Sequence, residues 1–110
     1  YGGVPMASSQ EYLDFILKQL QGLGQEISFR KMMGEYLLYY RGRLFGGIYD
    51  NRLMVKPVQP ALDFFENPLY ESPYPGAKPM LHIEEVEDAG FLCNLIEAAY
   101  PALPAPKKKK

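Results

Sequence analysis

Two helix-like patterns enclose a stretch of chain in which hydrophobic and polar residues alternate. Over residues 9–23, apolar side chains recur every three or four positions, as in a helix with one buried face, and Gly24 suits the left-handed conformation that follows a last turn. A second such pattern covers residues 87–100, where Asp88 places negative charge at the start and Pro101 ends the helix. We therefore predict a helix near each end of the chain.

The start of the first helix carries a capping box. The Ser8 hydroxyl can accept a hydrogen bond from the amide of Glu11, while the Glu11 carboxylate reaches back to the amide of Ser8. Residues 1–7 precede this box without periodicity, so we interpret them as a leader outside the fold.

Between the two helices the hydrophobic period shortens to two, which is typical of half-buried strands. The segments that show this period are 26–32, 36–40, 44–49 and 52–56. Because short polar links join them, they should form the antiparallel hairpins of a meander. Gly46 and Gly47 offer no side chains to pack, which indicates either a bulge or a very close neighbour. We favour close packing of the first helix against them.

After the meander the pattern is weaker. Pro60 suits the first position of a short helix over residues 60–65, and four prolines between residues 68 and 79 indicate turns, with a short strand at 69–71. A further strand is predicted at 79–83. The elements follow the order α-β-β-β-β-α-β-α, so we predict an α+β fold of two layers, with an antiparallel sheet of about five strands covered by the N- and C-terminal helices.

Composition supports one folded domain. The 110 residues are 47% hydrophobic and 23% charged, which is too apolar for a disordered chain. We assign the domain to residues 8–101 and expect residues 102–110, which end in four lysines, to form a flexible tail. No apolar run approaches the roughly 20 residues that span a bilayer. We therefore expect a cytoplasmic protein without membrane contact, either a monomer or a weak homodimer.

The reactive side chains are few. The single cysteine, Cys93, falls on the apolar side of the last helix, where we expect an inert buried thiol, and the single histidine, His82, should face solvent or a polar edge. The acidic residues at 84–88 lack the spacing of a calcium loop, and no glycine-rich phosphate loop occurs. We therefore predict no catalytic residue, metal site or cofactor. An enzyme would have to use His82 with Glu84 or Cys93.

Charge is unevenly distributed along the chain. Residues 1–60 hold seven basic and five acidic groups, whereas residues 61–106 hold one basic and eight acidic groups. Within residues 30–56, six basic groups face two acidic ones, with four tyrosines among them. Such a basic, aromatic sheet could bind single-stranded nucleic acid. The competing interpretation is that the tyrosines pack the sheet and that Arg41-Gly42-Arg43 is a solvated turn.

Three segments together resemble a known family. They are Arg30-Lys31-Met32-Met33-Gly34-Glu35-Tyr36-Leu37-Leu38-Tyr39, Leu44-Phe45-Gly46-Gly47-Ile48-Tyr49-Asp50 and Leu53-Met54-Val55-Lys56. The chain is similar, over about residues 8–100, to the N-terminal domain of the TfoX (Sxy) competence regulators. Met33 and Glu35 stand where the family pattern has Phe and a second Gly. The resemblance implies a two-layer α+β fold like that of secretion chaperones and a non-enzymatic regulatory role through protein binding.

The resemblance also implies an interaction surface, to which the basic meander adds two arginines. Its members are Arg30, Met33, Gly34, Tyr36, Arg41, Arg43, Gly47 and Lys56. A protein partner is the first expectation, and nucleic acid bound by the meander is the alternative.

Overall fold

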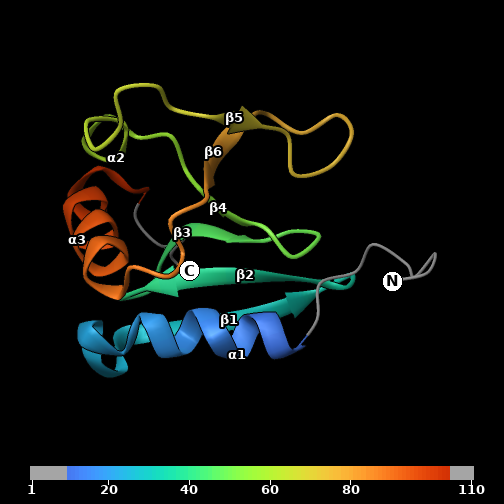
Figure 1. Cartoon of the computed structure of the whole chain (residues 1–110). Helices are drawn as coiled ribbons and strands as arrows, with labels where there is room; N and C mark the ends of the chain where they lie inside the picture. Colours follow the sequence, from blue (N-terminus) through green and yellow to red (C-terminus); the bar gives the residue numbers. More distant parts are fainter. Residues whose placement is uncertain (1–9, 105–110) are drawn as a thin grey trace, which may run out of the picture.

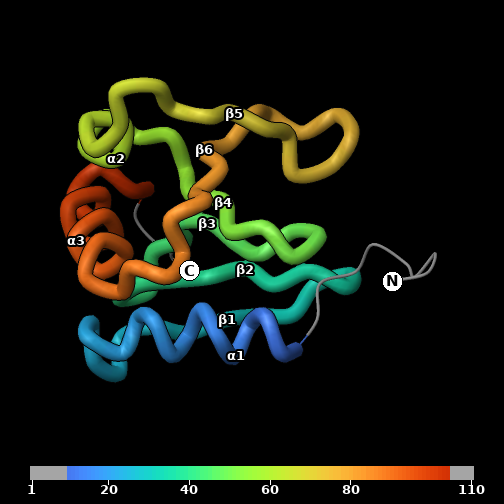
Figure 2. Tube along the Cα trace, viewed as in Figure 1, coloured from blue at the N-terminus to red at the C-terminus, as the bar shows by residue number. Residues whose placement is uncertain are grey.

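An antiparallel sheet forms one layer of the computed structural model, which describes residues 10–104 (Figure 1). Its strands are β1 (Ile27–Met32), β2 (Glu35–Tyr40), β3 (Arg43–Ile48), β4 (Leu53–Val55), β5 (Tyr70–Glu71) and β6 (Met80–Ile83). They lie in the order β1-β2-β3-β4-β6-β5. After β4 the chain runs out to the edge strand β5 before β6 returns to pair with β4 (Figure 2).

The second layer consists of helices from both ends of the chain and one short helix from its middle. They are α1 (Gln10–Gln19), the 3-10 turn η1 (Gln21–Glu26), α2 (Gln59–Leu62), α3 (Ala89–Ala99) and the 3-10 turn η2 (Tyr100–Ala102). The predicted fold class is confirmed. The short strand predicted at 69–71 is β5, so the sheet has six strands rather than about five, and two strands rather than one lie between α2 and α3 in the chain.

The helix ends follow local chemistry. Asp88 caps α3 by accepting a hydrogen bond from the amide of Phe91 at 3.0 Å. The first helix is shorter than predicted, because after Gln19 the chain tightens into η1, where Gly24 has a φ of 78°. The predicted capping residue Ser8 lies outside the described residues.

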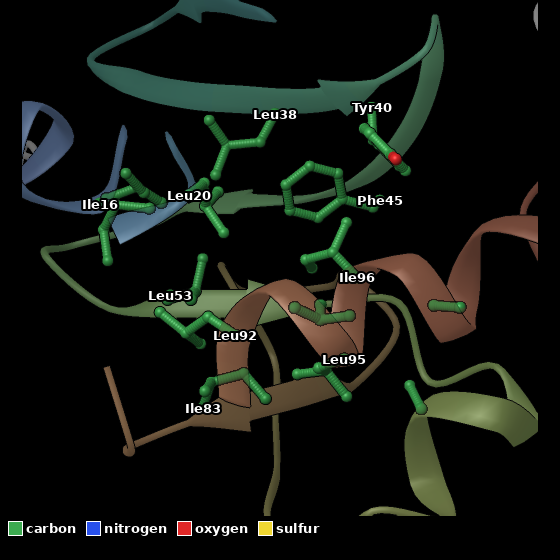
Figure 3. Packing of buried hydrophobic residues seen from close by; sticks show 14 of the residues in the cluster. Ile16, Leu20, Leu38, Tyr40, Phe45, Leu53, Ile83, Leu92, Leu95 and Ile96 are labelled. Atoms are coloured by element: carbon green, nitrogen blue, oxygen red, sulfur yellow. The ribbon is translucent and has the colours of Figure 1, made fainter. Parts of the chain in front are cut away.

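The hydrophobic core fills the space between the two layers. Along β2, burial alternates as the sequence pattern predicts: Tyr36, Leu38 and Tyr40 are buried toward the helices. Figure 3 shows Leu38 and Phe45 from the sheet gathered against Leu92 and Ile96 of α3. Burial of each such side chain contributes about 1.5–3 kcal/mol. Packing, rather than helix propensity, therefore holds α1 and α3 on the sheet.

The two glycines of β3 lie beside a bulge. Leu38 is opposite Gly46 and the next residue, Tyr39, is opposite Leu44, so Phe45 is the extra residue. A Cβ on Gly46 would lie 2.0 Å from the carbonyl oxygen of Met54, in the neighbouring strand β4. The expected close packing of the first helix against these glycines is therefore wrong, and the bulge is confirmed. The neighbouring strands, not a helix, crowd this backbone.

The ordered chain continues beyond the last predicted helix. Leu103 is 4% exposed and belongs to the core, although the sequence suggested a flexible segment from residue 102. The reason is a long-range contact: Arg43 donates hydrogen bonds to the carbonyl oxygens of Tyr100 and Leu103, at 3.1 and 3.3 Å. The side chain of one strand thereby fixes the end of η2.

Candidate interaction surface

The sheet face turned away from the helices is formed by the other residues of the same strands. Residues directly opposite each other in an antiparallel pair share a face. The pairings place Arg30 of β1, Leu37 of β2, Gly47 of β3, Met54 of β4 and His82 of β6 in one row. Because Leu38 and Leu53 belong to the helix-covered core, this row lies on the opposite side, which we call the open face because no helix covers it; its Met54 is nevertheless buried.

A groove of about 430 Å³ crosses one end of the open face. It is lined by Met32, Met33, Glu35, Leu37, Tyr49 and Tyr74, and we call it the open-face groove. Gly47 makes room for it, because a Cβ there would lie 2.9 Å from Cε2 of Tyr49. The missing side chain thus allows the Tyr49 ring to lie close to β3 and form one wall.

Two tyrosines, Tyr49 and Tyr74, form one wall of the groove. The rings of Tyr49 and Tyr74 have centroids 6.4 Å apart. Burial raises the pKa of Tyr49 above its ordinary value, and Tyr74, Glu35 and Tyr39 add to the shift in the same direction. Nearby, a Glu35 carboxylate oxygen accepts a hydrogen bond from the amide of Asp50 at 3.0 Å. Tyr49 is therefore a neutral phenol at physiological pH.

An exposed methionine stands at the rim of the groove. Met33 and Gly34 form the two-residue turn between β1 and β2, with φ values of 53° and 86°. Left-handed backbone at a residue other than glycine costs about 1 kcal/mol, and apolar side chains gain nothing from water. Met33 is nevertheless 96% exposed, and its neighbour Met32 is 48% exposed. We call this pair the methionine tip.

The structure does not bring the sequence-predicted surface residues together in one place. Arg30 and Gly47 belong to the open face, and Met33 and Gly34 lie at its rim. Tyr36 is 3% exposed and packs in the core, so its side chain is withdrawn from any surface.

The remaining predicted residues lie elsewhere. Arg41 pairs with Glu26 and stacks on the rings of Tyr40 and Tyr100, while Arg43 holds the end of η2. Arg41 lies in the turn at the opposite end of β2 from Met33, and Arg43 is the first residue of β3 after that turn. Half-buried Lys56 follows β4, and its amide donates to the carbonyl oxygen of Phe45 at 2.8 Å.

The predicted surface included only Met33 of the six lining residues and missed the other five, which are Met32, Glu35, Leu37, Tyr49 and Tyr74. Leu37 and Met32 carry a usable signal, since strand alternation places them opposite to core positions. Tyr49 was noted only as an aromatic residue of the meander. Tyr74 comes from the proline-rich segment before β6, which has no periodicity, so only the folded structure brings it to the groove.

The two reactive side chains have different, separate partners. His82 lies on the open face with Nδ1 3.3 Å from an oxygen of Glu71, and the same oxygen accepts a hydrogen bond from Arg52 at 2.6 Å. The half-buried Cys93 thiol donates to the carbonyl oxygen of Gln19 at 3.6 Å.

Within residues 10–104, no group of three or more His, Cys, Asp and Glu side chains is placed to hold a metal ion. In the same range, no helix has the length and hydrophobicity to cross a membrane.

These features define a class: a small α+β domain with one helix-covered sheet face and one open face that carries an apolar groove. The chain belongs to the TfoX N-terminal domain family, whose model matches residues 18–102. It is also 38% identical over 106 residues to a Spirochaeta aurantia protein described as "Uncharacterized 12.7 kDa protein in trpE 5'region", covering 96% of this chain and 91% of that protein. No solved structure matches the chain. The family supports a regulatory domain of the competence-regulator type.

Proposed function

We propose that this protein is a cytoplasmic, non-enzymatic regulatory domain that acts by binding another protein chain at its open-face groove. Family membership supports the regulatory role. The observation that carries the binding step is the methionine tip: two apolar side chains, 96% and 48% exposed, at the rim of an apolar groove. Exposed apolar patches beside a groove are characteristic of protein docking surfaces.

The distribution of charge favours a protein over a nucleic acid at this site. Two arginines of the basic meander, Arg41 and Arg43, are engaged in contacts within the chain and lie far along β2 from the groove. The groove itself includes the Glu35 carboxylate, and Asp50 lies beside it. Carboxylates at this position would repel phosphate groups.

Affinity capture with a matched pair of variants tests the proposal. The tagged protein is incubated with a lysate of the source organism, with and without nuclease. Met33→Glu places a charge on the methionine tip, and Leu69→Glu places one on an apolar residue 47% exposed near β5. We expect a protein partner that survives nuclease and is retained at least about tenfold less by Met33→Glu than by wild type or Leu69→Glu, as for loss of a central apolar contact.

Two results would contradict the proposal. Material that is captured only without nuclease would assign the surface to nucleic acid. A nuclease-resistant partner retained equally by both variants would move the binding site away from the groove.

A further inference from the structure

The methionine tip and the open-face groove adjoin each other on one surface. Because each copy carries both a projection and a hollow, two copies can fit each other through the same surface. Met33 and Met32 project from the hairpin between β1 and β2, and Leu37, Tyr49 and Tyr74 line the hollow beside them. In a two-fold dimer, the same patch of each copy meets the other. The tip of each copy then enters the groove of its counterpart, where a flexible thioether side chain can fill an irregular apolar space.

The charges flanking the tip have the same self-complementary arrangement. Arg30 lies on one side, on the edge strand β1. Asp50 lies on the other side, in the turn after β3, and lines a shallow hollow that shares Glu35 and Tyr74 with the groove. A two-fold axis that passes between the methionine tip and the groove exchanges the tip with the groove and the Arg30 side with the Asp50 side. It therefore brings Arg30 of one copy toward Asp50 of the other, which favours this pairing over contact with a surface of uniform charge.

From these two observations we infer that the open-face groove binds a second copy of this chain in a two-fold dimer, with the methionine tips exchanged and Arg30 facing Asp50. The inference deepens the proposed function by naming an occupant of the same groove. Its experiment uses the purified protein alone. Failure to self-associate would therefore refute this inference without refuting the proposed function, and failure to capture a partner from the lysate would not refute self-association.

Pairing of two sheet edges is the competing route to a dimer. The edge strand β1 carries Arg30 and Lys31 in succession, and basic side chains on an edge discourage strand addition. Two β1 strands paired antiparallel through their centres would bring both basic pairs together. The face of the sheet is therefore a better contact than its edge.

The contact area limits the strength of the dimer. Stable complexes bury roughly 800 Å² on each partner, and one hairpin tip with one groove offers less. We expect a dissociation constant on the order of 10–100 μM, corresponding to roughly 5.5–7 kcal/mol. Sedimentation equilibrium from about 5 μM to about 1 mM covers that range.

Charge exchange makes the experiment specific. Single substitutions Arg30→Glu and Asp50→Arg should each raise the dissociation constant at least about fivefold, and the double variant should return it to within about twofold of wild type. Arginine is acceptable at the left-handed backbone of Asp50, because Arg41 has the same conformation, with φ values of 55° and 51°. Met33→Glu should abolish dimer formation below about 1 mM, whereas Leu69→Glu should leave it unchanged.

The inference is overturned by a protein that stays monomeric at about 1 mM, or by a dimer that ignores Met33→Glu. It is also overturned if the two charge reversals weaken the dimer additively without rescue. Circular dichroism of each variant shows whether it is still folded. Because Met33 is 96% exposed, we expect Met33→Glu to keep the native spectrum, so its loss of dimer formation would report a lost contact.

Discussion

The two turns at the ends of β2 share one backbone conformation but differ in what surrounds their side chains. Met33-Gly34 has φ values of 53° and 86°, and Arg41-Gly42 has φ values of 51° and 81°. Positive φ at both central residues is the type I′ turn that matches strand twist. Arg41 is paired with Glu26 and stacked on Tyr40. Met33 is 96% exposed.

This comparison distinguishes the backbone conformation that each hairpin turn requires from the contacts that its side chain makes. Both turns require a residue that accepts left-handed backbone, and Asn or Asp would accept it at lower cost than Met or Arg. At Arg41 the cost is offset by contacts inside the molecule. Met33 is exposed and lacks contacts of that kind, and we propose that contact with another molecule explains the methionine there.

The largest expected effect is at Arg43, which follows the Arg41-Gly42 turn and holds the end of η2. Arg43→Ala removes two hydrogen bonds from Nη1 to backbone carbonyls and a guanidinium that lies 4.5 Å over the Tyr100 ring. Hydrogen bonds from charged groups contribute about 1.5–3 kcal/mol, so urea unfolding should show a loss of about 2–3 kcal/mol. The exposed Arg30→Ala is the control, at less than about 0.5 kcal/mol. Equal losses of stability in Arg43→Ala and Arg30→Ala would show that the contacts of Arg43 with η2 do not stabilise the fold.

The glycines of the two turns should behave alike. Gly34→Ala and Gly42→Ala each place a Cβ on backbone at φ 86° or 81°. Each should cost about 1–2 kcal/mol in the free energy of unfolding. A difference of more than about 1 kcal/mol between them would break the premise that the two turns share a backbone demand.

Substitution by asparagine should separate the residues that precede those glycines. Met33→Asn relieves the left-handed strain and removes only an exposed side chain, so stability should rise by about 0.5–1 kcal/mol. Arg41→Asn relieves the same strain but also removes the Glu26 pair and the stack on Tyr100. Its gain should be smaller or reversed in a parallel thermal melt. A gain at Arg41 as large as that at Met33 would refute the contrast between the turns.

The smallest expected effect concerns alkaline pH at the groove. Because burial raises the pKa of Tyr49, the folded state keeps the phenol neutral where the unfolded chain, with a pKa of about 10, begins to ionise. The resulting contribution to stability is complete below pH about 10 and is lost as pH rises through the folded value. Tyr49→Phe should therefore reduce the fall in melting temperature above that pH. Burial also raises the pKa of Tyr12 on α1, so Tyr12→Phe should act in the same direction; a steeper fall in either variant contradicts the assignment.

Strand positions were predictable because alternation is a local property. The predicted strand at 36–40 corresponds to β2 (Glu35–Tyr40), and the predicted helix at 87–100 corresponds to α3 (Ala89–Ala99). The bulge at Phe45 was open to two interpretations, since a glycine pair marks crowding without identifying the neighbour.

The candidate site was less predictable than the fold. Resemblance located Met33 and Gly34, but the same list included Tyr36, whose side chain the strand period directs into the core. The groove needs Tyr74, which reaches Tyr49 only because β5 and β6 carry the intervening loop to that end of the sheet. That juxtaposition depends on tertiary structure, and no local pattern encodes it.

The burial of Leu103 bears on how the domain should be dissected. The family match spans residues 18–102, yet Leu13 and Ile16 precede it, Leu103 follows it, and all three side chains lie in the core. A fragment trimmed to the matched residues would lose these three side chains, and with them about 4.5–9 kcal/mol of apolar burial, against a total stability of about 5–15 kcal/mol for an ordinary domain. The segment that the family model matches is therefore shorter than the segment whose side chains build the core.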